Sequence, residues 1–189
     1  YRGPIALRVN PGFGHGHVQA CDTGGPSSKH GIWHEDIDAT AALAKQAGFP
    51  VVALHAHVGT GPEISEFDHN MNRLVGLFAD LVQRFPETRA VNLGGGIPHP
   101  YRTAAQRYNL GGYRTLLLDA ASTLSEAAGH AVAMEIEPGR FLEELRAEFG
   151  ARVGDFKLVS GRAAYPLRLR RSPRTPLASR HKSGDSHTP

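Results

Sequence analysis

The stretch AMEIEPGR at residues 133–140 has the pattern of a short β-strand that ends in a Pro-Gly turn and an arginine. Residues two apart in a strand share a face, so Glu135 and Glu137 point to one side while Met134 and Ile136 point to the other. The apolar pair can pack against a helix. The two carboxylates then face an interior, where an unpaired charge is costly. This pattern is compatible with a binding site for a charged ligand. An edge strand with a solvated acidic face would give the same alternation.

Three earlier segments share this strand character, and segments with helical spacing separate them. The predicted strands are residues 5–10, 51–58, 90–93 and 131–137, and the predicted helices are residues 35–47, 64–85 and 112–128. Strand-to-strand connections of about 40 residues require parallel strands joined by crossover helices. The sequence therefore predicts an α/β fold with about four parallel strands.

Each predicted strand places polar side chains on one face and apolar side chains on the other. The polar positions are Arg8, Asn10, His55, His57, Asn92, Glu135 and Glu137. A doubly wound sheet is apolar on both faces, whereas a (β/α) barrel carries its active site at the carboxyl ends of its strands. A complete barrel needs eight strands and roughly 250 residues. We therefore expect the second half of a TIM-type barrel.

The composition is that of an ordinary globular protein, with 40% apolar and 21% charged residues among 189. No run approaches the roughly 20 apolar residues of a membrane helix, so we expect no membrane partner. Cys21 is the single cysteine, which excludes an internal disulfide and favours a reducing, cytoplasmic location. The chain begins with Tyr1 rather than Met, so we expect an internal piece of a longer protein; a processed or trimmed chain is the alternative.

The positive charge is concentrated near the C-terminus. Residues 161–189 hold seven Lys or Arg against Asp185, a net charge of +6, whereas the remaining 160 residues carry a net charge of −3. We expect this basic tail to be disordered because it has little apolar content. Apart from Tyr165, no aromatic residue lies among the basic residues of this tail. We therefore expect no nucleic-acid partner. A helix over residues 141–149 and a strand within residues 151–160 are expected before the tail.

Glycine-rich loops follow three of the strands, at residues 12–16, 59–61 and 94–96. Glycine after a strand lets backbone N–H groups converge on an anion. The triple glycine 94–96 is the strongest candidate, with a simple tight turn as the alternative. Histidines lie nearby in two pairs, at residues 15 and 17 and at residues 55 and 57. With Glu137 they could ligate a metal ion, but an imidazole can equally stack on a flat ring.

Five motifs together resemble the diaminopimelate decarboxylases, which are alanine-racemase-like (fold type III) pyridoxal-phosphate enzymes. They are LRVNPGFGHGH (7–17), TGGPSSKHGIW (23–33), HAHVGTG (55–61), NLGGGIP (92–98) and EPGRFL (137–142). The last three are shared with ornithine and arginine decarboxylases, whereas the first two are specific to the diaminopimelate enzymes. The resemblance covers residues 5 to about 142.

The resemblance implies a pyridoxal 5'-phosphate cofactor, no metal, an amino-acid substrate and a homodimeric full-length enzyme. The implied reaction converts meso-diaminopimelate to L-lysine and CO₂ in lysine biosynthesis. Two residues would be catalytic: Glu137 would pair with the pyridine nitrogen, and His57 would stack on the ring. Gly94, Gly95, Gly96 and Arg140 would hold the phosphate. The other implied cofactor-binding residues are Arg8, Gly139 and Thr60, which stands where the family usually has serine.

The sequence also departs from the family pattern. The lysine that links covalently to the cofactor lies on an early barrel strand that has no counterpart here, and Lys29 does not match it. The cysteine and tyrosine motifs of the C-terminal β-domain are missing. We therefore expect a partial barrel domain over residues 1–150, a β-domain that could start within 151–160, and an inactive isolated chain. A non-catalytic fragment that binds phosphate or a partner, and a related arginine or carboxynorspermidine decarboxylase, are the alternatives.

Overall fold

The computed structural model of the chain describes residues 1, 3–14, 23–59, 63–99, 107–139 and 141–142. Five strands and three helices lie within these ranges. The strands are β1 (Ile5–Asn10), β2 (Ile32–Trp33), β3 (Val51–His55), β4 (Ala90–Asn92) and β5 (Ala133–Glu135). The helices are α1 (Ile37–Gln46), α2 (Ile64–Arg84) and α3 (Leu110–Ala128).

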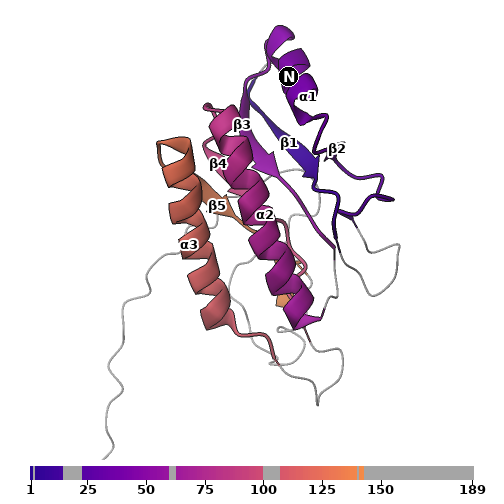
Figure 1. Ribbon diagram of the computed structural model, residues 1–189, viewed down its shortest axis with the longest axis vertical. Coiled ribbons are helices and arrows are strands. Elements are labelled where there is room, and N and C mark those ends of the chain that lie inside the picture. The colour runs from indigo at the N-terminus through magenta and orange to yellow at the C-terminus, as the bar shows by residue number, and fades with distance from the viewer. Residues whose placement is uncertain (2, 15–22, 60–62, 100–106, 140, 143–189) are drawn as a thin grey trace, which may run out of the picture.

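The strands form one parallel sheet in the order β2-β1-β3-β4-β5. The four strands expected from the sequence are therefore neighbours in chain order, and Figure 1 shows helices α2 and α3 side by side against them. The predicted α/β class, with parallel strands and crossover helices, is confirmed.

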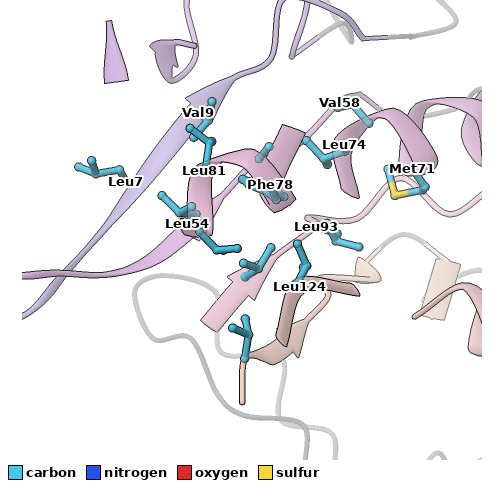
Figure 2. Close-up of a cluster of buried hydrophobic side chains, with 14 of the residues drawn as sticks. Leu7, Val9, Leu54, Val58, Met71, Leu74, Phe78, Leu81, Leu93 and Leu124 are labelled. Carbon is cyan, nitrogen blue, oxygen red and sulfur yellow. The ribbon is translucent and has the colours of Figure 1, made fainter. Parts of the chain in front are cut away.

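The hydrophobic core lies between the sheet and the helices (Figure 2). Helix α2 supplies buried side chains at three- and four-residue spacing, which places them along one stripe of the helix. They are Phe67, Met71, Leu74, Phe78 and Leu81, and they pack in one cluster with Leu7, Val9, Leu54, Val91 and Leu124. Met134 and Ile136 pack against this cluster, as their alternation with the two glutamates predicts. The opposite face of the sheet is left for polar groups.

Strand register organises this opposite face into rows. Neighbouring strands pair Ala6, Ala53, Ala90 and Ala133 as one row across β1, β3, β4 and β5. Two residues further along each strand, the next row consists of Arg8, His55, Asn92 and Glu135. Small side chains thus occupy the amino-terminal part of this face, and titratable or hydrogen-bonding side chains occupy the carboxyl ends.

Strand β2 was not expected, because two residues are too few to show alternation. It pairs with β1 through Val9–Ile32 and Asn10–Trp33. Gly31 precedes it with a φ of 79°, and a Cβ there would lie 2.9 Å from the backbone nitrogen of Asn10. Glycine therefore permits the close approach that creates this pairing.

Three strands end earlier than the alternation predicts, and β4 does so by one residue, at Asn92. Strand β3 stops at His55 and β5 stops at Glu135, so His57 and Glu137 lie just beyond the regular strands. Backbone hydrogen bonds nevertheless continue past these ends: Leu93 N–H donates to Glu135 O at 3.0 Å, and Glu137 N–H donates to Gly94 O at 2.8 Å. After β3, the backbone N–H of Ala56 likewise donates to Asn92 O at 3.0 Å, so backbone hydrogen bonds join the segments that follow β3, β4 and β5.

Most of the region after residue 140 lies outside the described residues. This includes most of the predicted helix 141–149, the strand expected within 151–160 and the tail 161–189. Among the described residues, none of the helices combines the length and apolar character needed to span a membrane.

Candidate functional site

A cavity of about 260 Å³ lies at the carboxyl ends of β1, β3 and β4 and beside the chain that follows β5. Its lining consists of Arg8, His55, His57, Gly95, Gly96, Ile97, His99, Glu137, Pro138, Gly139 and Phe141. Six site residues expected from the sequence meet here: Arg8, His57, Gly95, Gly96, Glu137 and Gly139. Gly94 adjoins them beneath His57. Thr60 and Arg140 lie outside the described residues.

The glycine loop Gly94–Gly96 packs too tightly against its neighbours to carry side chains. A Cβ on Gly95 would lie 2.2 Å from the Glu137 carbonyl oxygen, and one on Gly96 would lie 2.1 Å from the Gly59 carbonyl oxygen. Gly94 and Gly96 also have φ angles of 70° and 84°, which favour glycine. The triple glycine thus brings the ends of β3, β4 and β5 into backbone contact.

His57 is oriented by this loop. The backbone N–H of Gly95 donates to His57 Nδ1 at 3.1 Å. Because Nδ1 accepts a hydrogen bond, the proton of the neutral imidazole lies on Nε2. The ring is therefore fixed in one tautomer at the wall of the cavity.

The Glu137 carboxylate faces the cavity and is held from one side by Asn92. Asn92 Nδ2 donates to Glu137 Oε1 at 3.1 Å and to Glu135 Oε2 at 3.3 Å. The side chain of Glu137 remains 58% exposed, so one edge of the carboxylate is accessible. His55 Nε2 lies 3.8 Å from Glu137 Oε2, which is beyond hydrogen-bonding distance.

Arg8 and His55 are paired neighbours on β1 and β3, and both are partly buried. Arg8 Nε and His55 Nε2 are buried and have no hydrogen-bond partner among the described residues. Burial lowers the pKa of Arg8, and the Glu137 carboxylate opposes that shift. Burial also lowers the pKa of His55; Glu137 raises it, and Arg8 lowers it further. His55 is therefore neutral at pH 7.

Acidification is expected to destabilise the fold through His55. Because burial holds the folded-state pKa below the ordinary value of 6.5, the unfolded chain binds this proton more readily. The stabilising contribution is full above pH 6.5 and is lost as the pH falls from that value toward the folded-state pKa.

His55→Gln removes this titration. Urea unfolding at pH 7.5 and at pH 5.5 should therefore show a smaller loss of unfolding free energy in the variant than in the wild type. His69→Gln, on the exposed side of α2, is the matched control for the loss of a histidine. An identical pH dependence in His55→Gln and the wild type would contradict the assignment.

The sequence did not identify five of the cavity's lining residues as site residues: His55, Ile97, His99, Pro138 and Phe141. His55 was interpreted only as an inward-facing residue and a potential metal ligand, although its two-residue spacing from His57 was a usable signal. His99 and Phe141 lie outside any strand; Phe141 belongs to the motif EPGRFL, whereas His99 belongs to none of the five motifs, and their rings meet edge to face with centroids 6.0 Å apart. Asn10 was expected on the polar face, but its side chain instead donates to Gly25 O at 3.2 Å and holds the loop before β2.

The histidine pairs do not form a metal centre in the described part of the chain. No group of three His, Cys, Asp or Glu side chains converges within it. His15 and His17 lie outside the described residues. The expectation of a metal-free site remains a prediction.

A larger hollow of about 480 Å³ lies between α2 and α3 and contains none of the expected site residues. Tyr108 there donates its hydroxyl to Asp68 Oδ1 at 2.6 Å. Burial, followed by this hydrogen bond, raises the pKa of Tyr108, so the phenol is neutral. Tyr108 also packs edge to face on Phe67. Its contacts are therefore explained by packing against helix α2.

Comparisons with known proteins point to one family. Residues 2–144 match the family model described as pyridoxal-dependent decarboxylase, pyridoxal binding domain. The diaminopimelate decarboxylase of Streptomyces coelicolor is 38% identical over 139 residues, which cover 74% of this chain and 31% of that protein. A crystal structure of a diaminopimelate decarboxylase superposes with a TM-score of 0.64 and 35% identity, covering 74% of this chain and 32% of the other.

A more distant structure shows the fold alone. It is the Helicobacter pylori diaminopimelate decarboxylase complexed with L-lysine, with a TM-score of 0.59, 22% identity, and coverage of 72% of this chain and 34% of the other. The chain thus spans about a third of the length of the relatives it matches. The predicted resemblance, the partial-barrel fold and the pyridoxal cofactor class are confirmed by these matches.

Proposed function

The chain belongs to the pyridoxal-dependent decarboxylases through their pyridoxal binding domain, and on this premise we propose that its cavity is the cofactor site of a diaminopimelate decarboxylase. One observation carries the proposal: a single cavity is lined by His57, the glycine loop and Glu137, which come from three separate strand ends. Since the matched residues cover only 31% of the Streptomyces coelicolor relative, the complete reaction is proposed for a longer protein that contains this domain.

The residues at the cavity fit pyridoxal phosphate chemically. The glycine loop offers backbone with no side chain in the way, which suits a phosphate. An oriented imidazole can lie against a flat ring, and a partly exposed carboxylate can face a protonated ring nitrogen. Arg8 Nε and His55 Nε2 are buried polar atoms at the same wall that have no hydrogen-bond partner among the described residues. Such atoms are usually satisfied by a ligand or water.

Each residue then has a specific task. Gly94–Gly96, Gly139 and Arg140 bind the phosphate, and Thr60 contributes a hydroxyl. His57 supports the ring face, and Arg8 lies near the ring. Glu137 holds a proton at the ring nitrogen. When bound, pyridoxal phosphate supplies an electron-withdrawing ring that accepts the electron pair left when the substrate carboxylate departs as CO₂.

The proposed substrate is meso-diaminopimelate and the product is L-lysine, by analogy with the named relatives. No lysine among residues 1–142 matches the family's covalent attachment point, so the 189-residue chain alone is proposed to bind cofactor without decarboxylating. We further propose a homodimeric, cytoplasmic full-length protein with no nucleic-acid partner. The partial barrel is assigned to residues 1–150, a β-domain start to 151–160 and a basic tail to 161–189.

Titration with pyridoxal phosphate tests this function. The chain should show saturable binding in the absorbance spectrum, and inorganic phosphate should compete. Arg140→Ala should weaken binding by about 10- to 150-fold, because hydrogen bonds to charged groups contribute about 1.5–3 kcal/mol. Arg114→Ala, on the exposed side of α3, is the matched control.

Three outcomes would contradict this account. An absence of saturable binding would favour a non-catalytic fragment. Equal losses in the Arg140 and Arg114 variants would show that binding is merely electrostatic. Borohydride trapping of the cofactor at one lysine within residues 1–142, together with decarboxylation, would show that the chain is complete and that its attachment lysine has been misplaced.

A further inference from the structure

Asn92 occupies a central position in the site without lining the cavity. It is the last residue of β4, it is only 8% exposed, and its register partners are His55 on β3 and Glu135 on β5. A buried amide needs hydrogen-bond partners, and the partners of Asn92 come from two elements that the proposed function uses separately.

The hydrogen bonds of Asn92 fix which way its amide points. The backbone N–H of Gly94 donates to Asn92 Oδ1 at 2.8 Å. A backbone N–H can only donate, so the oxygen must face Gly94, and the NH₂ group must face the opposite way. There it donates to Glu137 Oε1 and to Glu135 Oε2. A rotated amide would lose the bond to Gly94 and would turn an oxygen toward two carboxylates.

A second connection runs in parallel between the same two elements. Glu137 N–H donates to Gly94 O at 2.8 Å, and a Cβ on Gly95 would meet the Glu137 carbonyl oxygen. The backbone therefore fixes the position of residue 137, whereas Asn92 contacts the carboxylate itself. The side chain links the start of the glycine loop to the group that would meet the ring nitrogen.

We propose that Asn92 is a positioning residue that couples the glycine loop to the Glu137 carboxylate, so that the phosphate end and the ring-nitrogen end of the site are set as one unit. This inference rests on the proposed function for its cofactor. Its geometry concerns this chain's own residues.

Two substitutions distinguish the contact of Asn92 with Gly94 from its contacts with the two carboxylates. Asn92→Asp keeps an oxygen that accepts from Gly94 N–H but places a second oxygen against Glu135 and Glu137. Asn92→Ala removes both contacts. Asn72→Asp, on the exposed side of α2, is the matched control. Each chain is titrated with inorganic phosphate and with pyridoxal phosphate, and circular dichroism checks that it is folded.

Asn92→Asp should leave the affinity for inorganic phosphate within about twofold of the wild type but weaken pyridoxal phosphate by about tenfold or more, as expected for a lost hydrogen bond to a charged group. It should also shift the pH at which the absorbance of the bound cofactor changes. Asn92→Ala should weaken both ligands. Equal proportional losses of the two ligands in Asn92→Asp, or wild-type binding of both, would overturn the coupling.

A measurement without cofactor separates failure of this inference from failure of the proposed function. Glu137→Gln should move the Gly94 amide signal in ¹H–¹⁵N spectra, and the movement should be smaller in the Asn92→Ala background. If the wild type binds no pyridoxal phosphate but this difference is seen, the proposed function fails and the coupling holds. If the movement is the same in both backgrounds, the coupling is overturned.

Discussion

Alanine at position 95 is expected to abolish measurable binding of pyridoxal phosphate. The added Cβ would lie 2.2 Å from the Glu137 carbonyl oxygen, well inside van der Waals contact. Gly95 has no positive φ, so the whole effect comes from this collision rather than from backbone strain. The collision involves backbone on both sides, so either the glycine loop or the chain at Glu137 must move. Either movement separates the proposed phosphate end of the site from its proposed ring-nitrogen end. Overpacking of this kind also costs about 1–3 kcal/mol of stability.

Gly76→Ala is the matched control, since it makes the same chemical change elsewhere. Gly76 lies on the exposed side of α2, and a Cβ there has nothing within 4 Å. This substitution should leave cofactor affinity unchanged and raise the free energy of unfolding by about 0.5–1 kcal/mol, because glycine is unfavourable inside a helix. Cofactor titration and urea unfolding of both variants provide the measurements. Binding by Gly95→Ala within a fewfold of the wild type would contradict the proposed role of the loop.

Phe78→Ala should cause the largest loss of stability. Phe78 is completely buried at the centre of the α2 stripe that packs on the sheet (Figure 2). Truncating a buried phenylalanine typically costs about 3–5 kcal/mol, because the lost burial is compounded by the cavity left behind. Since a domain is stable by only about 5–15 kcal/mol in total, this variant should unfold at much lower urea concentration.

Circular dichroism during urea unfolding measures this effect. Leu43→Ala is the control: Leu43 lies on α1 with 65% of its surface exposed, so its truncation should change the unfolding free energy by less than about 0.5 kcal/mol. A loss below about 1 kcal/mol for Phe78→Ala would show that α2 does not pack on the sheet as described.

The periodicity of the sequence predicted most of the strands and helices and part of the site. The alternation of Glu135 and Glu137 with Met134 and Ile136 separated the cavity side from the core side. Helical spacing in α2 predicted its buried stripe. Three consecutive glycines after a strand indicated a candidate binding loop, with a simple tight turn as the alternative, and Gly95 and Gly96 line the cavity. These features are local, and local patterns are what a sequence displays directly.

Contacts between distant segments could not be predicted in the same way. The pairing of β2 with β1 depends on a close approach at Gly31, and two residues carry no periodic signal. The position of His55 beside Glu137 follows from the register of three strands. The amide orientation of Asn92 follows from a backbone N–H two residues later and from two carboxylates, one at the end of β5 and one just beyond it. Each of these requires knowledge of register, which alternation alone does not supply.

We propose that the strand ends carrying Arg8, His57, Gly94–Gly96 and Glu137 form one pyridoxal-phosphate site. A crystal structure of the 189-residue chain with pyridoxal phosphate tests it most directly. We expect the phosphate to lie against Gly94–Gly96, the ring beside His57 and the ring nitrogen within hydrogen-bonding distance of Glu137. A cofactor bound instead in the hollow between α2 and α3, or on a surface lysine, would contradict it.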